Sequence, residues 1–262
     1  MAISSVNGLL KSFVNECVKV FGGCVRSIVL YGGLARGEFV PRVSDIDLVI
    51  ILQDDCWHGV VDEATYPVPR WIVEKVLEIV DNIHRRHGLG EYVIDVRVTS
   101  TTVIKERLDP RINSLWLNSL LSCYVVLYGE NVFKNFTPPP ISRKDIVKAL
   151  EEYLKTVKLI SKAKRVGGKV LTLRDKAKAC INNALLAVQA FLCLYDKFYP
   201  SKREAWNRFM EIFGFEKRFK DLPDLYGRLV RINELNVSEL KESITKSVKL
   251  VELLAGELVK EI

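Results

Sequence analysis

The sequence predicts two domains: a mixed α/β domain with a small mixed sheet, followed by an all-α helical bundle. Strand-like and helix-like segments alternate over roughly the first 135 residues, and only helical periodicity follows them. Between the two regions, Thr137-Pro138-Pro139-Pro140 cannot continue a helix or a strand, because proline has a fixed φ and no N–H donor. We therefore expect domains at residues 1–136 and 142–262, joined by a proline-rich linker at 137–141.

In the first domain, the apolar spacing distinguishes helices from strands. Pro67 and Pro69 precede one helical pattern and Gly88 follows it, which are the positions where helices begin and end. Alternating or continuously apolar runs rich in valine and isoleucine predict strands. The expected helices cover 3–21, 70–87 and 101–119, with a short one beginning near 34, and the expected strands cover 25–31, 45–52, 91–98 and 123–128.

The second domain has the pattern of an antiparallel bundle of four or five helices. Ser142 and Asp145 have the spacing of a helix start, and the apolar residues after them recur at helical intervals. Gly167-Gly168 interrupts the pattern. Further helices are expected over 172–198, 202–213, 217–232 and 237–260.

The segment from Ser27 to Ile51 has the residue types of a phosphate and metal site. An apolar strand leads to Gly32-Gly33, whose backbone can approach an anion closely, and Arg36 could hold the same phosphate. The next strand carries Asp45 and Asp47, which would face the same side, roughly 6.6 Å apart. Paired carboxylates of this kind are suitable ligands for Mg²⁺ or Mn²⁺.

A third carboxylate follows in the run Glu91–Val98. Asp95 lies between apolar residues, where an unpaired buried charge would be costly. It could therefore complete the metal site or accept a proton from an attacking hydroxyl. The alternative is an edge-strand residue that points to solvent and pairs with Arg97.

Two stretches, Gly32-Gly33-Leu34-Ala35-Arg36-Gly37 and Ser44-Asp45-Ile46-Asp47-Leu48, resemble the signature of polymerase-β-type nucleotidyltransferases. The likeness is to the small prokaryotic members and to the antibiotic adenylyltransferases, which also have a C-terminal helical bundle. Two features depart from the family pattern. Gly33 replaces the commoner serine, and the loop from Gly37 to Ser44 is about one residue longer than in the family.

The resemblance implies a metal-dependent transfer of a nucleoside monophosphate, with ATP as the expected donor and pyrophosphate as the leaving group. It implies Asp45, Asp47 and Asp95 as catalytic residues and ligands of Mg²⁺ or Mn²⁺, and it implies a nucleotide-binding set of Gly32, Gly33, Arg36 and Ser44. The acceptor stays open between a small molecule, a protein and RNA. The alternatives are template-independent nucleotide addition to RNA ends and a non-catalytic, antitoxin-like or regulatory nucleotide-binding protein.

The composition is that of an ordinary globular protein, with 48% hydrophobic and 27% charged residues and a net charge of +7. No apolar run approaches the ~20 residues of a membrane span, so we expect a cytoplasmic protein without membrane contact. The six cysteines have no CxxC pairing or metal-ligand spacing, and most of them are expected to be small buried hydrophobes. Homo-oligomerisation stays open.

Positive charge is concentrated between residues 143 and 178, where twelve lysines and arginines accompany four acidic residues. Such a stripe can attract a triphosphate or a nucleic acid at long range, or it can be the solvated face of two helices. Apart from Tyr153 it contains no aromatic residue that could stack on bases, which favours a small-molecule or protein acceptor over RNA.

Overall fold

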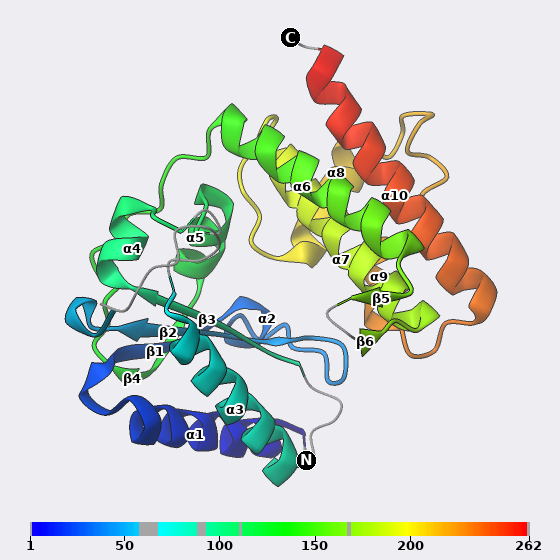
Figure 1. Ribbon diagram of the computed structural model, residues 1–262. Coiled ribbons are helices and arrows are strands. Elements are labelled where there is room, and N and C mark those ends of the chain that lie inside the picture. The colour runs from blue at the N-terminus through cyan, green and yellow to red at the C-terminus, as the bar shows by residue number, and fades with distance from the viewer. Residues whose placement is uncertain (1, 58–67, 88–92, 110–111, 167–168, 261–262) are drawn as a thin grey trace. The chain divides into compact units, whose positions relative to one another are not determined.

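The computed structural model describes residues 2–57, 68–87, 93–109, 112–166 and 169–260 (Figure 1). Two compact units divide the chain, Met1–Pro139 and Pro140–Ile262, and the division falls inside the segment expected to be a linker. The mixed α/β unit followed by a helical unit confirms the predicted fold class. None of the described helices combines the length and the hydrophobicity that crossing a membrane requires.

The first unit is built on a four-stranded mixed sheet in the order β3-β2-β1-β4. β1 (Val25–Tyr31) pairs antiparallel with both β2 (Ile46–Leu52) and β4 (Val125–Gly129), whereas β3 (Ile94–Ser100) runs parallel to β2. β1 and β2 are almost continuously apolar and buried, as central strands covered on both faces should be. The strand order makes β3 an edge strand, and β3 carries Asp95.

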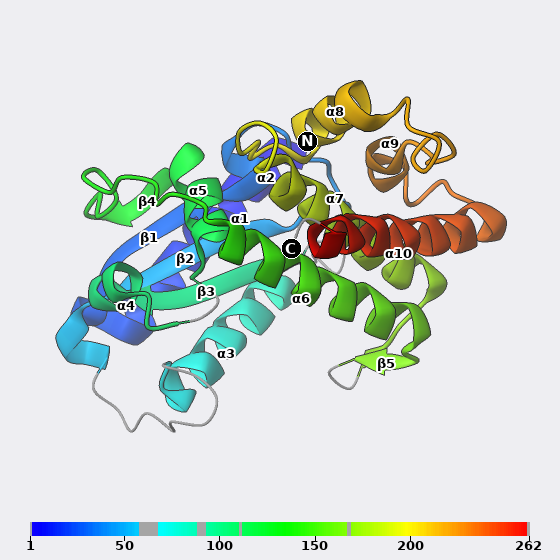
Figure 2. The same cartoon turned by 90° about the horizontal axis from the view of Figure 1, so that it is seen from above.

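Helices cover both faces of this sheet. α1 (Ala2–Phe21) and α3 (Arg70–His87) contact one another on one face, and α4 (Thr101–Glu106) and α5 (Ser114–Ser122) lie on the opposite face (Figures 1 and 2). The apolar positions of these helices and strands form one continuous core. η1 (Gly22–Cys24) and η2 (Asp54–Trp57) are single 3₁₀ turns at one end of the β1–β2 pair.

Some predicted boundaries in this unit were wrong. The helix expected over 101–119 is two helices, because Arg107 adopts the left-handed conformation (φ 53°) after α4 and Asn113 caps α5. α2 (Gly32–Ala35) begins at Gly32 rather than near 34. Of the strand expected over 91–98, residues 91–92 lie outside the described residues, and β3 continues to Ser100.

The cysteine prediction was also wrong in part. Cys24 and Cys56 form a disulfide with a Cα–Cα distance of 5.6 Å, and the Gln53 N–H donates to the Cys24 carbonyl at 2.8 Å. The pairing of β1 with β2 brings the ends of both strands together, although the two cysteines are 32 positions apart in sequence. Cys17 and Cys180 are buried free thiols, as expected.

In the second unit, three long helices contact one another: α6 (Arg143–Lys162), α7 (Leu173–Leu192) and α10 (Val237–Lys260). Reciprocal capping boxes begin two of them, Ser142 with Asp145 at α6 and Thr172 with Asp175 at α7. α8 (Lys202–Phe213) and α9 (Leu225–Val230) complete the unit, and rings of Phe191, Phe209 and Phe213 form an aromatic cluster in its core.

The helical unit differs from the expectation at three places. β5 (Arg165–Val166) and β6 (Lys169–Val170) form a short antiparallel pair in a region expected to be only helical. α7 ends at Leu192, six residues before the predicted end. The helix expected over 217–232 is only α9, because Pro223 disfavours helical backbone before it and Asp224 caps the helix after it.

Candidate functional site

The strand register brings the expected carboxylates together at one end of the sheet. Asp47 of β2 lies directly opposite Asp95 of β3, and on its other side it lies opposite Tyr31 of β1. Neighbouring strands are about 4.8 Å apart, so these three side chains form a row on one face of the sheet. Asp45 lies one residue before β2 instead of within it.

The exposure of the carboxylates differs from the expectation for Asp95. Asp45 and Asp47 are half-buried, whereas Asp95 is exposed, because β3 is the edge strand. The argument from a costly buried charge therefore does not apply to Asp95. Its register with Asp47 is what associates it with the site.

Gly32 is required by its conformation and by the close approach of Asp47. Its φ is +74°, in the region that favours glycine. A Cβ atom at this position would overlap Oδ2 of Asp47 and lie 2.8 Å from its Cγ. At Gly33, by contrast, the nearest atom to an added Cβ is the Glu38 carbonyl oxygen at 3.9 Å. The backbone of the turn therefore lies directly against the Asp47 carboxylate.

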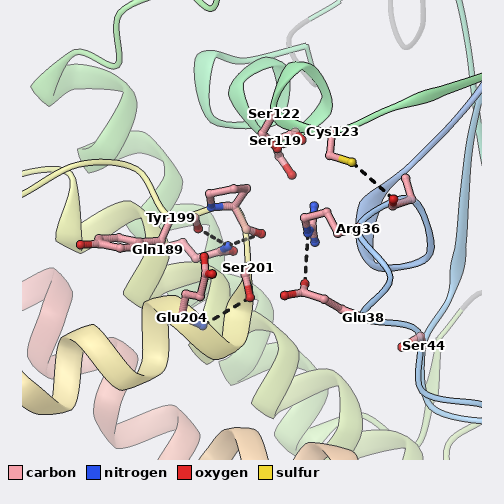
Figure 3. Close-up of polar contacts among 12 residues, drawn as sticks. Arg36, Glu38, Ser44, Ser119, Ser122, Cys123, Gln189, Tyr199, Ser201 and Glu204 are labelled. Carbon is pink, nitrogen blue, oxygen red and sulfur yellow. Dashed lines mark hydrogen bonds and ion pairs between the residues drawn. The ribbon is translucent and has the colours of Figure 1, made fainter.

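Arg36 caps the C-terminal end of the single turn of α2. Its N–H donates to the Gly32 carbonyl at 3.2 Å, and its Nε donates to Oε2 of Glu38 at 3.1 Å (Figure 3). The Arg36 side chain is 16% exposed, and its buried Nη1 has no hydrogen-bond partner among the described residues. An anion at this position would supply the acceptor that Nη1 lacks.

Ser44 shapes the loop before β2. The Val40 N–H donates to its Oγ at 2.9 Å, and the Ser44 N–H donates back to the Val40 carbonyl at 2.8 Å. Its oxygen therefore already accepts one hydrogen bond within the loop.

Three side chains that the sequence did not single out for the site complete this face: Tyr31, Arg97 and Trp116. Nε1 of Trp116 donates to the Tyr31 hydroxyl at 3.1 Å, with the two rings in an edge contact. The Arg97 guanidinium lies over the Trp116 ring, 4.4 Å from its centre. Arg97 is two residues from Asp95 and so is on the same face of β3. The sequence gives no signal for the cluster of Tyr31, Arg97 and Trp116, because the three residues belong to β1, β3 and α5 and meet only in the folded protein.

The pKa of Tyr31 reflects this setting. Burial, and next the negative charge of Asp47, raise the pKa of its hydroxyl to about 12, while the Trp116 hydrogen bond and the Arg97 charge lower it. Tyr31 is therefore a neutral hydroxyl at physiological pH, close to both the carboxylates and the guanidinium.

The protein side chains alone do not form a complete metal cage. Within the described ranges, no group of three or more His, Cys, Asp or Glu residues is arranged to hold a metal ion. Mg²⁺, however, is usually bound through one or two carboxylates together with water and substrate phosphates. Asp47 and Asp95, which are neighbours in the register, fit that kind of site, in which the nucleotide supplies the remaining ligands.

Comparisons with known proteins relate the first unit to one enzyme family and the whole chain to one fold. Residues 10–121 match the model of a nucleotidyltransferase domain family. A protein of Methanocaldococcus jannaschii, named as a candidate protein adenylyltransferase, is 28% identical over 133 residues, which are 50% of this chain and 78% of that protein. The crystal structure of a spectinomycin adenyltransferase from Enterococcus faecialis, with ATP and spectinomycin, aligns with 94% of this chain and 99% of its own at a TM-score of 0.54. At 10% identity, this last likeness concerns the fold alone.

Proposed function

We propose that the protein transfers AMP from ATP to an acceptor hydroxyl or phosphate and releases pyrophosphate, on the premise that residues 10–121 match a nucleotidyltransferase domain family. The observation that carries the proposal is the row formed by Asp47 and Asp95 next to the Gly32 turn. It combines carboxylates with a backbone that only glycine permits, which are the parts that phosphoryl chemistry requires.

We propose Asp45, Asp47 and Asp95 as the residues that would hold Mg²⁺ or Mn²⁺. When bound, such an ion neutralises charge on the phosphate oxygens and fixes their orientation. Asp47 is placed by β2 and by its contact with Gly32, and Asp45 by the preceding loop. Asp95 has a second possible role, because an exposed carboxylate can take the proton of the attacking hydroxyl.

Gly32, Gly33, Arg36 and Ser44 are the proposed nucleotide-binding residues. N–H groups at the start of a helical turn have no partners within the turn, so those of α2 can donate to phosphate oxygens. The buried Nη1 of Arg36, which has no hydrogen-bond partner among the described residues, supports a phosphate bound near α2. For Ser44, whose Oγ already accepts from Val40, a role in holding the loop is the simpler one.

ATP as donor rests on the two relatives, each named as an adenylyltransferase. One acts on a protein by its name, and the other was crystallised with spectinomycin, so we propose a small molecule or a protein as acceptor. Nucleotide addition to RNA ends is the second candidate, favoured by the basic residues of α6. We propose the cytoplasm, where ATP is available, as the compartment.

The test is a transfer assay with each of the four α-labelled ribonucleoside triphosphates, with pyrophosphate release as the second readout. Candidate acceptors are aminoglycoside-like small molecules, the protein itself, other proteins and RNA. We expect acceptor-dependent labelling from ATP that Asp47→Asn abolishes. Labelling that persists in Asp47→Asn, or pyrophosphate release that no acceptor increases and no carboxylate variant lowers, would contradict the proposal.

A further inference from the structure

One face of α6 carries a row of lysines. Lys144, Lys148, Lys155, Lys158 and Lys162 follow one another at intervals of four, seven, three and four residues, which places them on one side of an α-helix. All five are exposed. Glu151 is the one acidic residue among them on this side, so the row, here called the lysine face, is strongly positive.

Little within the unit compensates this charge. Lys158 forms an ion pair with Glu252 of α10, with Nζ and Oε1 2.9 Å apart. Lys148, Lys155 and Lys162 form no ion pair within the part of the chain that the structure describes. Like charges at such spacings repel one another, and an anion bound from outside the protein would reduce this repulsion.

The positive charge continues beyond the helix. Lys164 and Arg165, where β5 begins, are exposed as well. Leu159 is 62% exposed and lies one turn from Lys155 and Lys162, which adds an apolar contact to the charged row. Such a surface can contact a polyanion that also has apolar parts.

The length of the row identifies the class of anion. Lys144 and Lys162 are 18 positions apart, which corresponds to about 27 Å along a helix. One triphosphate is far shorter and would use only part of the row. The row is straight, whereas the phosphates of a duplex follow two helical tracks. A flexible single strand can lie along it and be held through its phosphates, without the base stacking for which this segment has too few aromatic residues. RNA is the nucleic acid whose loops and ends are commonly recognised in single-stranded form. We propose that the lysine face of α6 binds single-stranded RNA.

The test uses the full-length protein and a labelled oligouridylate of about 20 nucleotides, with binding followed by fluorescence anisotropy. If about five phosphates are neutralised, affinity should fall about 100-fold between 50 and 200 mM salt. Replacing Lys148, Lys155 and Lys162 together by glutamate should abolish binding at the higher salt. The matching glutamine triple variant, which adds no negative charge, should make the salt slope shallower by about two units.

The control changes the same total charge elsewhere in the same unit. Lys217, Lys220 and Lys241 are exposed, and their triple replacement by glutamate should leave most of the affinity. Circular dichroism establishes that every variant is folded. Because the carboxylates of the first unit take no part, a failure of RNA binding would leave the proposed transfer of AMP to a small molecule or a protein untouched. It would remove only the support for RNA as the acceptor.

Three results would overturn the proposal. Absence of binding to wild type at 50 mM salt would show that the lysine face does not bind RNA. Equal losses of RNA affinity in the α6 and control variants would show that binding depends on the net charge of the protein and not on the lysine face. Equal or stronger binding of single-stranded DNA or of an oligoglutamate peptide would assign the face to another partner.

Discussion

Gly32 shows at the scale of one residue why a glycine stands beside the carboxylates. A positive φ alone would tolerate asparagine in many turns, but the Asp47 carboxylate occupies the space that any Cβ would need. Gly33 has no such neighbour. The two glycines thus have different roles, although they are adjacent in sequence.

Gly32→Ala should weaken ATP binding and destabilise the protein by about 1–3 kcal/mol, since it adds backbone strain and displaces the Asp47 carboxylate. Gly33→Ala is the matched control: it keeps the backbone N–H proposed to bind phosphate and adds its Cβ where the nearest atom is 3.9 Å away, so it should change both quantities little. Chemical denaturation and calorimetric ATP titration measure the two effects. Equal behaviour of the two variants would contradict the close approach as the reason for Gly32.

Asp95→Asn should lower turnover by roughly 100-fold while the affinity for ATP changes little, because the amide keeps the shape but neither accepts the proton nor carries the charge. Asp55→Asn, at another exposed aspartate of the same unit, is the control. Steady-state kinetics measure the turnover, and calorimetric titration measures the affinity for ATP separately. A fully active Asp95→Asn protein would assign the third carboxylate to another position.

The raised pKa of Tyr31 predicts that the stability of the fold decreases at alkaline pH. Its pKa is about 12 in the folded protein, above the ordinary value of 10.0 that applies when unfolded. Below pH 10 both states are protonated, and the tyrosine adds no pH dependence. Between pH 10 and 12 only the unfolded state releases the proton, so stability should fall by up to about 2–3 kcal/mol. Tyr31→Phe should reduce this fall, and ultraviolet absorbance should show one late-titrating phenol fewer. Unchanged titration in Tyr31→Phe would contradict the buried setting of its hydroxyl.

At the scale of elements, the Cys24–Cys56 disulfide closes the loop that contains β1, α2 and β2. Gly32, Asp45 and Asp47 all lie inside this loop. The bridge is formed at the ends of the strands that are opposite to the Gly32 turn, so it constrains the β1–β2 pair without touching the carboxylates.

Cys24→Ser should lower the free energy of unfolding under oxidising conditions by about 3–4 kcal/mol, the chain-entropy value for a loop of this size. Adding a reductant to wild type should give the same loss, and it should not affect Cys24→Ser further. Cys193→Ser, which removes a free cysteine, is the control. An unchanged melting temperature of wild type after reduction would show that the bridge does not stabilise the fold.

The elements that the sequence predicted are those with strong local signals. α1, α3, α6, α8 and α10 have long amphipathic patterns or caps, and the central strands are continuously apolar. The failures are at breaks whose signals are single residues, such as Pro223 before α9 and Asn113 before α5. The β5–β6 pair is too short to have a periodic pattern of its own.

At the scale of the whole molecule, a local motif predicts the carboxylates, but only tertiary pairing predicts their surroundings. Asp45 and Asp47 stand two positions apart, and Asp95 lies in an alternating strand, so sequence was sufficient to nominate them. Arg97, Trp116 and Tyr31 come from three separate elements, and their contacts exist only because β3 pairs with β2 and α5 covers that face. The disulfide was missed for the same reason.

The central claim is that Asp45 and Asp47 bind a metal–nucleotide complex beside the Gly32 turn. Calorimetric titration of ATP into wild type, Asp45→Asn and Asp47→Asn, each with Mn²⁺ and with a chelator, tests it most directly. We predict that Mn²⁺ strengthens ATP binding to wild type at least 10-fold, about 1.4 kcal/mol, and that either substitution removes this gain. ATP affinity that is the same in all three proteins, or that does not depend on the metal, would contradict the account.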